Sequence, residues 1–196
     1  MLIYMIRHGQ TDWNAEGRLQ GQQDIDLNAL GREQASRNGE ELARLIGTHV
    51  DDFAFVASPM ARTRETMERL RTAMGLSPSD YQTDARLVEV SFGDWEGHTL
   101  KDLKKSTPDR LKARRAAKWD FIPPGEAAES YEILSWRVAS WLRSVNQPTV
   151  CVSHGGVVRT LFHLVGEMEK NEAAWAAIPQ DQILRLDTDT NHYRWL

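Results

Sequence analysis

The sequence contains a single cysteine, Cys151, among its 196 residues. One thiol excludes an intramolecular disulfide framework and is typical of proteins kept in a reducing compartment, so we expect a cytoplasmic location. Cys151 lies within TVCVSH, a stretch that predicts a buried strand, and a free cysteine in such a place is usually a small apolar core residue. We therefore expect a structural role for Cys151 and not that of a nucleophile.

Long hydrophobic runs and a strong charge of one sign are also missing. No apolar stretch approaches the ~20 residues that a membrane helix needs, and the opening Met1 to Ile6 is too short for the core of a signal peptide. The net charge is -4 and the isoelectric point is near 5.9, so no basic excess points to nucleic acid or a membrane surface as a partner. The length fits one domain, residues 1–196, with room for a sizeable core.

Two common catalytic motifs do not occur. There is no His-Glu-x-x-His run or comparable spacing of metal ligands, and no Gly-x-x-x-x-Gly-Lys loop of the kind that cradles nucleotide phosphates. We therefore expect no catalytic metal, no cofactor and no nucleotide kinase of that type.

Short apolar runs alternate with amphipathic segments along the chain. The runs predict strands at Leu2–Ile6, Phe53–Ala57, Arg86–Val90 and Thr149–Val152, and two short terminal strands at Ile183–Leu186 and His192–Trp195. Helices are expected from the N-cap Asn28 to about Gly47, from Ser58-Pro59 to Gly75, and from about Gly156 to Val165. This alternation predicts an α/β fold, a three-layer α/β/α sandwich around a mostly parallel sheet.

The stretch from Leu103 to Trp141 departs from the alternation. It begins with basic residues, passes through Pro-Pro-Gly, and ends acidic and helical. We expect a variable insertion at about 103–141 that lies over the edge of the sheet. Its acidic run from Glu126 to Glu132 would repel a highly charged anion if it folded over a binding site. Arg114 and Arg115 would attract such an anion, and a solvated helix face is the alternative for both.

Two His-Gly steps follow two of the predicted strands, His8-Gly9 in RHGQTDWN and His154-Gly155 in SHGGVVRT. In open α/β sheets ligands bind at the carboxyl ends of the strands, so we expect both imidazoles to face a ligand. Arg7 adds a planar, permanently charged fork suited to phosphate oxygens. The glycines allow the backbone to come close to a ligand.

Two further segments supply a cation and a carboxyl. Arg62 lies in the first turn of the helix predicted from SPMARTRET, with Thr66 one turn later on the same face. Helix N-termini favour anions, so a cation there is misplaced unless it binds one. Glu89, in LVEVSFGDWEG, has glycine and aromatic neighbours that would exclude water and suit the carboxyl to general-acid work. The remaining arginines of that helix are expected to be solvated: Arg64, Arg69 and Arg71.

Two imidazoles, two guanidiniums and one carboxyl at one rim of a sheet indicate phosphoryl transfer. Histidine is a competent covalent nucleophile, which splits one difficult displacement into two easier ones. The arginines would stabilise charge on the transferring group, and the carboxyl would protonate the leaving oxygen. One histidine would attack while the other helps to hold the phosphate.

The order of these blocks resembles that of the histidine phosphatase superfamily, which includes cofactor-dependent phosphoglycerate mutases and broad-specificity phosphatases. RHGQTDWN is similar to the family's opening signature, and SPMARTRET, LVEVSFGDWEG and SHGG follow in the family's order. The resemblance covers Ile3 to about Gly47, Phe53 to Leu100 and Val150 to Leu161. It implies a phosphoglycerate mutase-like fold.

The resemblance also implies roles for individual residues. His8 would be the phosphorylated nucleophile, and Glu89 the proton donor and acceptor. Arg7, Arg62 and His154 would form the phosphate pocket. The substrate-binding residues would be Asn14, Gln20, Gly21 and Gly155. Gln10 stands where mutases usually carry an acidic residue, which counts against mutase activity.

The implied function is that of a metal-independent phosphomonoester hydrolase of the broad-specificity phosphatase branch. Its partner would be a small phosphorylated metabolite, with neither nucleic acid nor membrane involved. A cofactor-dependent phosphoglycerate mutase is one alternative. A non-catalytic protein that binds phosphorylated ligands is an alternative of another class, although a binder needs neither nucleophile nor acid. The oligomeric state and the physiological substrate stay open. His98, Trp13 and Trp95 are further candidates for the pocket wall.

Overall fold

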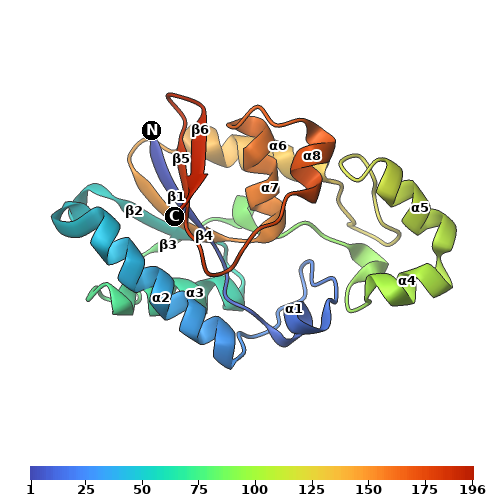
Figure 1. Ribbon diagram of the computed structural model, residues 1–196, viewed down its shortest axis with the longest axis horizontal. Helices are drawn as coiled ribbons and strands as arrows, with labels where there is room; N and C mark the ends of the chain where they lie inside the picture. Colours follow the sequence, from blue (N-terminus) through green and yellow to red (C-terminus); the bar gives the residue numbers. More distant parts are fainter.

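A six-stranded sheet forms the centre of the computed structural model, which describes residues 1–196 (Figure 1). The strands are β1 (Leu2–Arg7), β2 (Ala54–Ala57), β3 (Gln82–Thr83), β4 (Thr149–Ser153), β5 (Leu184–Asp187) and β6 (His192–Trp195). Their order is β3-β2-β4-β1-β5-β6. β3, β2, β4 and β1 run parallel, whereas β5 is antiparallel to both β1 and β6. The predicted α/β fold with a mostly parallel sheet is confirmed.

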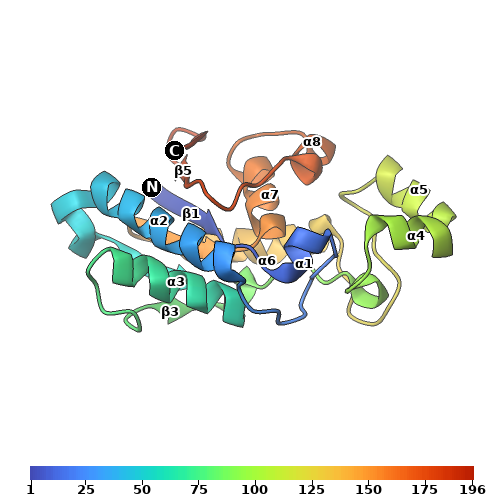
Figure 2. The same ribbon diagram turned by 60° about the horizontal axis from the view of Figure 1, so that its bottom comes forward.

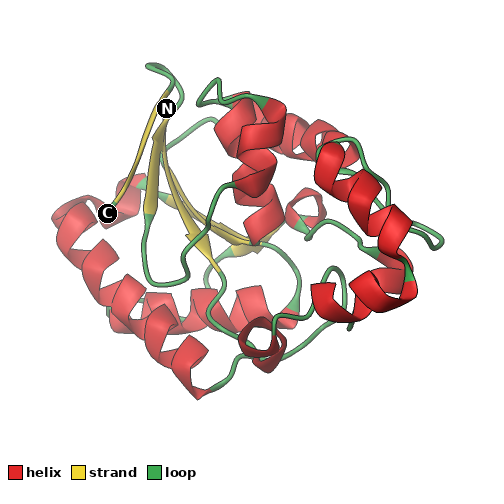
Figure 3. Ribbon diagram, turned by 45° about the vertical axis from the view of Figure 1, so that its right-hand side comes forward, coloured by secondary structure: helices red, strands yellow, loops and turns green.

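Helices cover both faces of the sheet (Figures 2 and 3). The helices are α1 (Asp12–Glu16), α2 (Ala29–Ile46), α3 (Ala61–Ala73), α4 (Leu100–Ser106), α5 (Pro108–Ala116), α6 (Tyr131–Ser144), α7 (Gly155–Leu164) and α8 (Lys170–Trp175). α2 and α3 pack together on one face, and α6 and α7 pack together on the other, with α8 against α7. No helix combines the length and the apolar character that crossing a bilayer requires.

Alternation along the central strands divides the core into two halves. In β1, Ile3 and Met5 join the cluster beneath α6 and α7, whereas Tyr4 and Ile6 join the cluster beneath α2 and α3. Successive side chains of a strand point to opposite faces, so a strand covered on both sides is apolar at every position. Cys151 in β4 is buried among the first cluster, as expected for a structural thiol.

The predicted start is confirmed for one helix and wrong for another. Asn28 caps α2 as predicted, because its side chain accepts a hydrogen bond from the backbone N–H of Gly31 at 2.9 Å. α3, however, begins at Ala61 and not at Ser58-Pro59. The backbone N–H of Ala61 donates to the Asp24 carboxylate at 2.9 Å, so a distant loop supplies the cap that the local sequence lacks.

The predicted strand at Arg86–Val90 is wrong. A single 3-10 turn spans Ala85–Leu87, and an extended loop follows it. The strand beside β2 is β3 instead, at Gln82–Thr83. The carbonyl groups of this loop accept hydrogen bonds from side chains of other elements rather than from a neighbouring strand.

α4 and α5 project from one end of the molecule as an arm with a small core of its own (Figure 1). That core consists of Trp95, Leu103 and Leu111. α6, by contrast, packs on the sheet through Leu134 and Val138. The stretch 103–141 therefore contains most of the arm and most of a sheet-covering helix; its status as a variable insertion stays a prediction.

Candidate active site

The two His-Gly steps meet at the carboxyl ends of β1 and β4, which are neighbouring parallel strands. The ring centroids of His8 and His154 lie 5.3 Å apart, with an edge-on angle of 61°. Both side chains are buried. Arg7 and Ser153 are register partners, so the strand pairing itself brings the two imidazoles together.

His8 is held in one tautomer. Its Nδ1 lies 2.8 Å from the carbonyl oxygen of Gly9, which can only accept, so Nδ1 carries the proton and Nε2 keeps its lone pair. Burial lowers the pKa of His8 well below its usual value, and the charges of Arg62 and Arg7 lower it further. The imidazole is therefore neutral at neutral pH, which is the state a nucleophile needs.

His154 is held by Ser58, the residue that follows β2. The His154 Nε2 lies 2.8 Å from the Ser58 hydroxyl, and its Nδ1 is buried without a hydrogen-bond partner. Burial, and then the charges of Arg62, His8 and Arg7, lower the pKa of His154 well below its usual value. Ser58 was not predicted as a site residue. The parallel strand β2, which pairs with β4, places its hydroxyl beside His154.

Two guanidiniums at the site have donors that no protein group accepts. Arg7 donates from Nη1 to the carbonyl of Ile178 at 2.8 Å, and Arg62 donates to the carbonyls of Gln23 and Gly21 at 2.7 and 2.8 Å. The Nε atoms of both arginines are buried without a partner. Buried donors are normally paired, so these unused N–H groups indicate an anion site. Burial, together with Arg159, lowers the pKa of Arg7 to about 10, which leaves it charged at neutral pH.

Glu89 reaches the N-terminus of α7. Its carboxylate accepts hydrogen bonds from the backbone N–H of Gly156 at 3.0 and 3.1 Å and from that of Val90 at 2.9 Å. A Cβ at Gly156 would lie 2.2 Å from Oε1 of Glu89, so only glycine permits this approach. The second glycine of SHGG thus makes room for the carboxyl.

The backbone around Glu89 is held by Arg137 on α6. Its Nη1 donates to the carbonyls of Arg86 and Val88, and its Nη2 donates to the carbonyl of Glu89 at 3.0 Å. Glu129 pairs with Arg137 at 2.9 Å and also accepts from the backbone N–H of Ser91 at 3.0 Å. Neither Arg137 nor Glu129 was a predicted site residue, because nothing in their local sequence marks them.

The predicted substrate-binding residues surround the same place. Asn14 accepts from Gln180 at 3.0 Å, and Gln20 donates to the Thr11 hydroxyl while its Oε1 is buried and unpaired. Gly21 has a φ of +54°, and a Cβ there would collide with Glu96. The Gln20 contact ties the loop that follows α1 to Thr11, and the Asn14 contact ties α1 to Gln180.

A cavity of about 130 Å³ opens here. It is lined by seven predicted residues, namely Arg7, His8, Asn14, Gln20, Gly21, Glu89 and Gly155, and by Arg18, Leu19, Phe92, Tyr131 and Arg159. Arg62 and His154 are fully buried and do not line it. The last five lining residues were missed, although the spacing of Arg159 four residues after Gly155 on α7 was a usable signal.

The other candidates for the pocket wall lie elsewhere. His98 is exposed and outside the cavity, Trp13 packs against Gly97, and Trp95 belongs to the core of the arm. Arg114 is buried rather than solvated.

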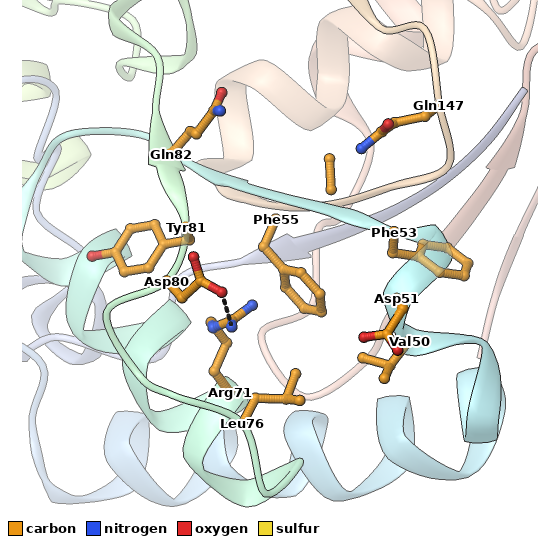
Figure 4. A pocket seen from close by; sticks show the side chains of 11 residues that line it. Val50, Asp51, Phe53, Phe55, Arg71, Leu76, Asp80, Tyr81, Gln82 and Gln147 are labelled. Atoms are coloured by element: carbon orange, nitrogen blue, oxygen red, sulfur yellow. Dashed lines mark ion pairs between the residues drawn. The ribbon is translucent and has the colours of Figure 1, made fainter.

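A second cavity, of about 400 Å³, lies where β2 and β4 begin, at the opposite edge of the sheet (Figure 4). Arg71 lies over the ring of Phe55 at 4.4 Å, donates to the carbonyl of Ser77, and pairs with Asp80 at 3.6 Å. The prediction that Arg71 is solvated is wrong, because its side chain covers the core at this edge. The cavity holds no histidine, and its arginine is already paired.

The fold and the cavity at the strand ends define a known class of protein. The model of the histidine phosphatase superfamily (branch 1) matches residues 3–196, and the chain belongs to that family.

Sequence identity and structural superposition show how similar the chain is to individual members of the family. The chain is 33% identical to phosphoglycerate mutase-like protein 4 of Arabidopsis thaliana over 82% of its own length and 69% of the relative's. It is 34% identical to glucosyl-3-phosphoglycerate phosphatase of Mycobacterium tuberculosis over 81% and 72% of the two chains. The structure of a mycobacterial glucosyl-3-phosphoglycerate phosphatase in complex with VO3 superposes with a TM-score of 0.78, at 27% identity, over 99% of this chain and 96% of that one.

Proposed function

We propose that this protein is a metal-independent phosphomonoester hydrolase that acts on a small phosphorylated metabolite through a phosphohistidine at His8. One observation carries the proposal: His8, whose Nε2 keeps its lone pair, lies close to Arg7 and Arg62, and each of these arginines has a buried Nε–H without a partner. Relatives that are named glucosyl-3-phosphoglycerate phosphatases support the same chemistry.

The first step forms a bond between Nε2 of His8 and phosphorus, and breaks the bond between phosphorus and the ester oxygen. Arg7, Arg62 and His154 take up the phosphoryl oxygens and stabilise their charge in the transition state. Glu89, in its protonated form, gives its proton to the leaving alkoxide, so the first product departs as an alcohol.

The second step reverses these roles. The Glu89 carboxylate takes a proton from a water molecule whose oxygen attacks phosphorus, and the bond between phosphorus and Nε2 breaks. His8 returns to its neutral state, inorganic phosphate leaves, and Glu89 is again protonated. Both proton movements use the one carboxyl that reaches the cavity beside His8 and Gly155.

Phosphoglycerate mutase activity is the second candidate. The acidic run would oppose it if its charge faced the cavity, but Glu129 pairs with Arg137 and Glu132 pairs with Lys170 at 2.8 Å. Those two carboxylates are therefore neutralised. The relative named phosphoglycerate mutase-like protein 4 supports mutase activity as the alternative.

The proposal is tested by trapping the intermediate. Brief exposure of the purified protein to a labelled monoester, with and without a chelator, should leave an acid-labile and base-stable adduct on the peptide that contains His8. His8→Asn should abolish the adduct and lower turnover by about 10³-fold or more, whereas His49→Asn, at an exposed position, should change neither. Label on Cys151 or on a serine, or turnover lost to the chelator, would contradict the mechanism.

A further inference from the structure

A third arginine lines the cavity and has no carboxylate partner. Arg159 lies one turn after Gly155 on α7, and a Cβ at Gly155 would lie 3.2 Å from Nη1 of Arg159 and 3.5 Å from Nε of Arg7. The two guanidiniums thus flank the same glycine. Arg159 donates from Nε to the carbonyl of Ala176 at 2.9 Å and from Nη1 to the Tyr131 hydroxyl at 3.4 Å. Neither acceptor neutralises its charge.

Arg114 adds a buried positive charge near Arg159, whereas the pKa of Lys118 beside it is lowered to about 6, so that Lys118 is mostly uncharged at neutral pH. Arg114 and Lys118, at the end of the arm, are both buried, and both contact the Trp175 ring, at 5.5 and 4.0 Å from its centroid. Lys118 donates to the carbonyl of Ala174, and neither cation has an ion-pair partner. The other two buried cations, Arg62 and Arg71, do have aspartates, at 4.0 and 3.6 Å. Arg114 is therefore a buried guanidinium whose charge no carboxylate offsets.

The cations around Arg159 lower one another's pKa values. Burial lowers the pKa of Lys118 to about 6, and the charges of Arg159 and then Arg114 contribute. Arg159 also lowers the pKa of Arg7. Arg159 and Arg7 both line the cavity with His8, whereas Arg114 and Lys118 do not. Like charges gathered in a cavity favour an anion there.

We propose that Arg159, with the Tyr131 hydroxyl beside it, binds a carboxylate of the substrate, so that the preferred substrates are phosphomonoesters of hydroxy acids. The inference rests on the proposed function and adds the substrate class. With Nε used by Ala176, the two Nη groups of Arg159 present the paired N–H bonds that a planar carboxylate accepts. A cavity of about 130 Å³ suits a carboxylate close to the phosphate better than a second phosphate.

The test compares substrates that differ in this one group. 3-Phosphoglycerate and glycerol 3-phosphate share the phosphate ester and differ by a carboxylate against a hydroxymethyl group. We expect kcat/KM to favour the carboxylate by about 10- to 100-fold, as one charge-assisted bidentate contact allows. Arg159→Gln should bring that ratio close to one, mainly through KM. Arg159→Lys should restore part of the preference, and Arg143→Gln, at an exposed position on α6, should leave it unchanged.

The outcomes separate this inference from the function on which it rests. If the wild type hydrolyses both esters without preference, or if Arg159→Gln slows both equally, Arg159 only ties α7 to the segment after α8 and the inference is wrong. A preference for glycerol 1,3-bisphosphate over 3-phosphoglycerate would overturn the choice of carboxylate. If no monoester turns over, the proposed function fails, and calorimetric binding of the two esters to wild type and Arg159→Gln still decides the carboxylate site.

Discussion

The Arg137 guanidinium donates a hydrogen bond to the carbonyl oxygen of Glu89 at 3.0 Å, across 48 residues of sequence. The same guanidinium holds the carbonyls of Arg86 and Val88, and Ser153 at the end of β4 holds that of Leu87 at 2.8 Å. Four successive carbonyl groups are thus fixed by two side chains from α6 and β4. These hydrogen bonds position the backbone of Glu89, whose carboxyl we propose as the general acid.

Arg137→Gln is therefore expected to impair the acid without touching the phosphoryl group. Turnover of alkyl phosphates should fall by about 10- to 100-fold because Glu89 is displaced, while nitrophenyl phosphate, whose leaving group needs little protonation, should be affected far less. Arg137→Lys should recover part of the loss. In a Glu89→Gln background the same change should add little, because the two residues act together. Additive losses in steady-state assays would show that Arg137 serves stability only.

Glu89→Gln tests the acid itself. The amide keeps the shape of the side chain but has no proton to give, so alkyl phosphates should lose on the order of 10²-fold more activity than nitrophenyl phosphate. The measurement is kcat for both classes of substrate on wild type and variant. Equal losses for both classes would assign Glu89 to binding.

The balance between hydrolysis and isomerisation is a third prediction. A mutase must keep its phosphohistidine from water while the phosphoglycerate turns around, and a cavity of about 130 Å³ leaves little room for that. Gln10, moreover, is turned toward α2, where it accepts from Asn28 at 3.0 Å. We expect release of inorganic phosphate from 3-phosphoglycerate to outrun formation of 2-phosphoglycerate, with or without a bisphosphoglycerate primer. Faster isomerisation at millimolar substrate would establish the mutase instead.

Acid should destabilise the protein through its two buried imidazoles. The pKa values of His8 and His154 are lowered in the folded state, so below about pH 6.5 the unfolded chain binds protons that the folded chain does not. The resulting stability is complete above the unfolded pKa and is lost as pH falls below it, by about 1.4 kcal/mol per pH unit for each imidazole. Chemical denaturation between pH 7.5 and 5 measures the slope. His8→Gln should remove one of the two contributions, and an unchanged slope would contradict this origin.

Gly31→Ala should destabilise the fold where the first turn of α2 packs against the loop after β1. A Cβ at Gly31 would lie 2.1 Å from the carbonyl oxygen of Gln10, and a Cβ at Gly9 would lie 2.2 Å from that of Gly31. Both obstacles are backbone atoms, which cannot rotate away, so overpacking should lower the free energy of unfolding by about 1–3 kcal/mol. Glu40→Ala, at an exposed position of α2, is the matched control for denaturant titration. Equal stabilities would mean that the loop after β1 shifts without cost.

Much of the molecule follows from local sequence. The interiors of the central strands are apolar because both faces of the sheet are covered, and those apolar runs are visible in the chain itself. Asn28 before an amphipathic stretch specifies the start of α2 through one hydrogen bond within the same turn. His8 and His154 could be placed at one rim because parallel strands bring their carboxyl ends to the same edge of the sheet.

Other features depend on contacts between segments far apart in the chain. The loop at Arg86–Val90 has the residue types of a strand. Its carbonyl groups, however, accept hydrogen bonds from the side chains of Arg137 and Ser153 instead of from a neighbouring strand, and the local sequence does not reveal these distant donors. The start of α3 depends in the same way on Asp24. Arg159 lies in a helix and Lys118 lies just after one. Helical spacing alone does not show which neighbours their side chains contact. Only the packing of α5, α7 and α8 around Trp175 and Tyr131 brings these side chains together, because their contacts depend on distance in space and not on separation in sequence.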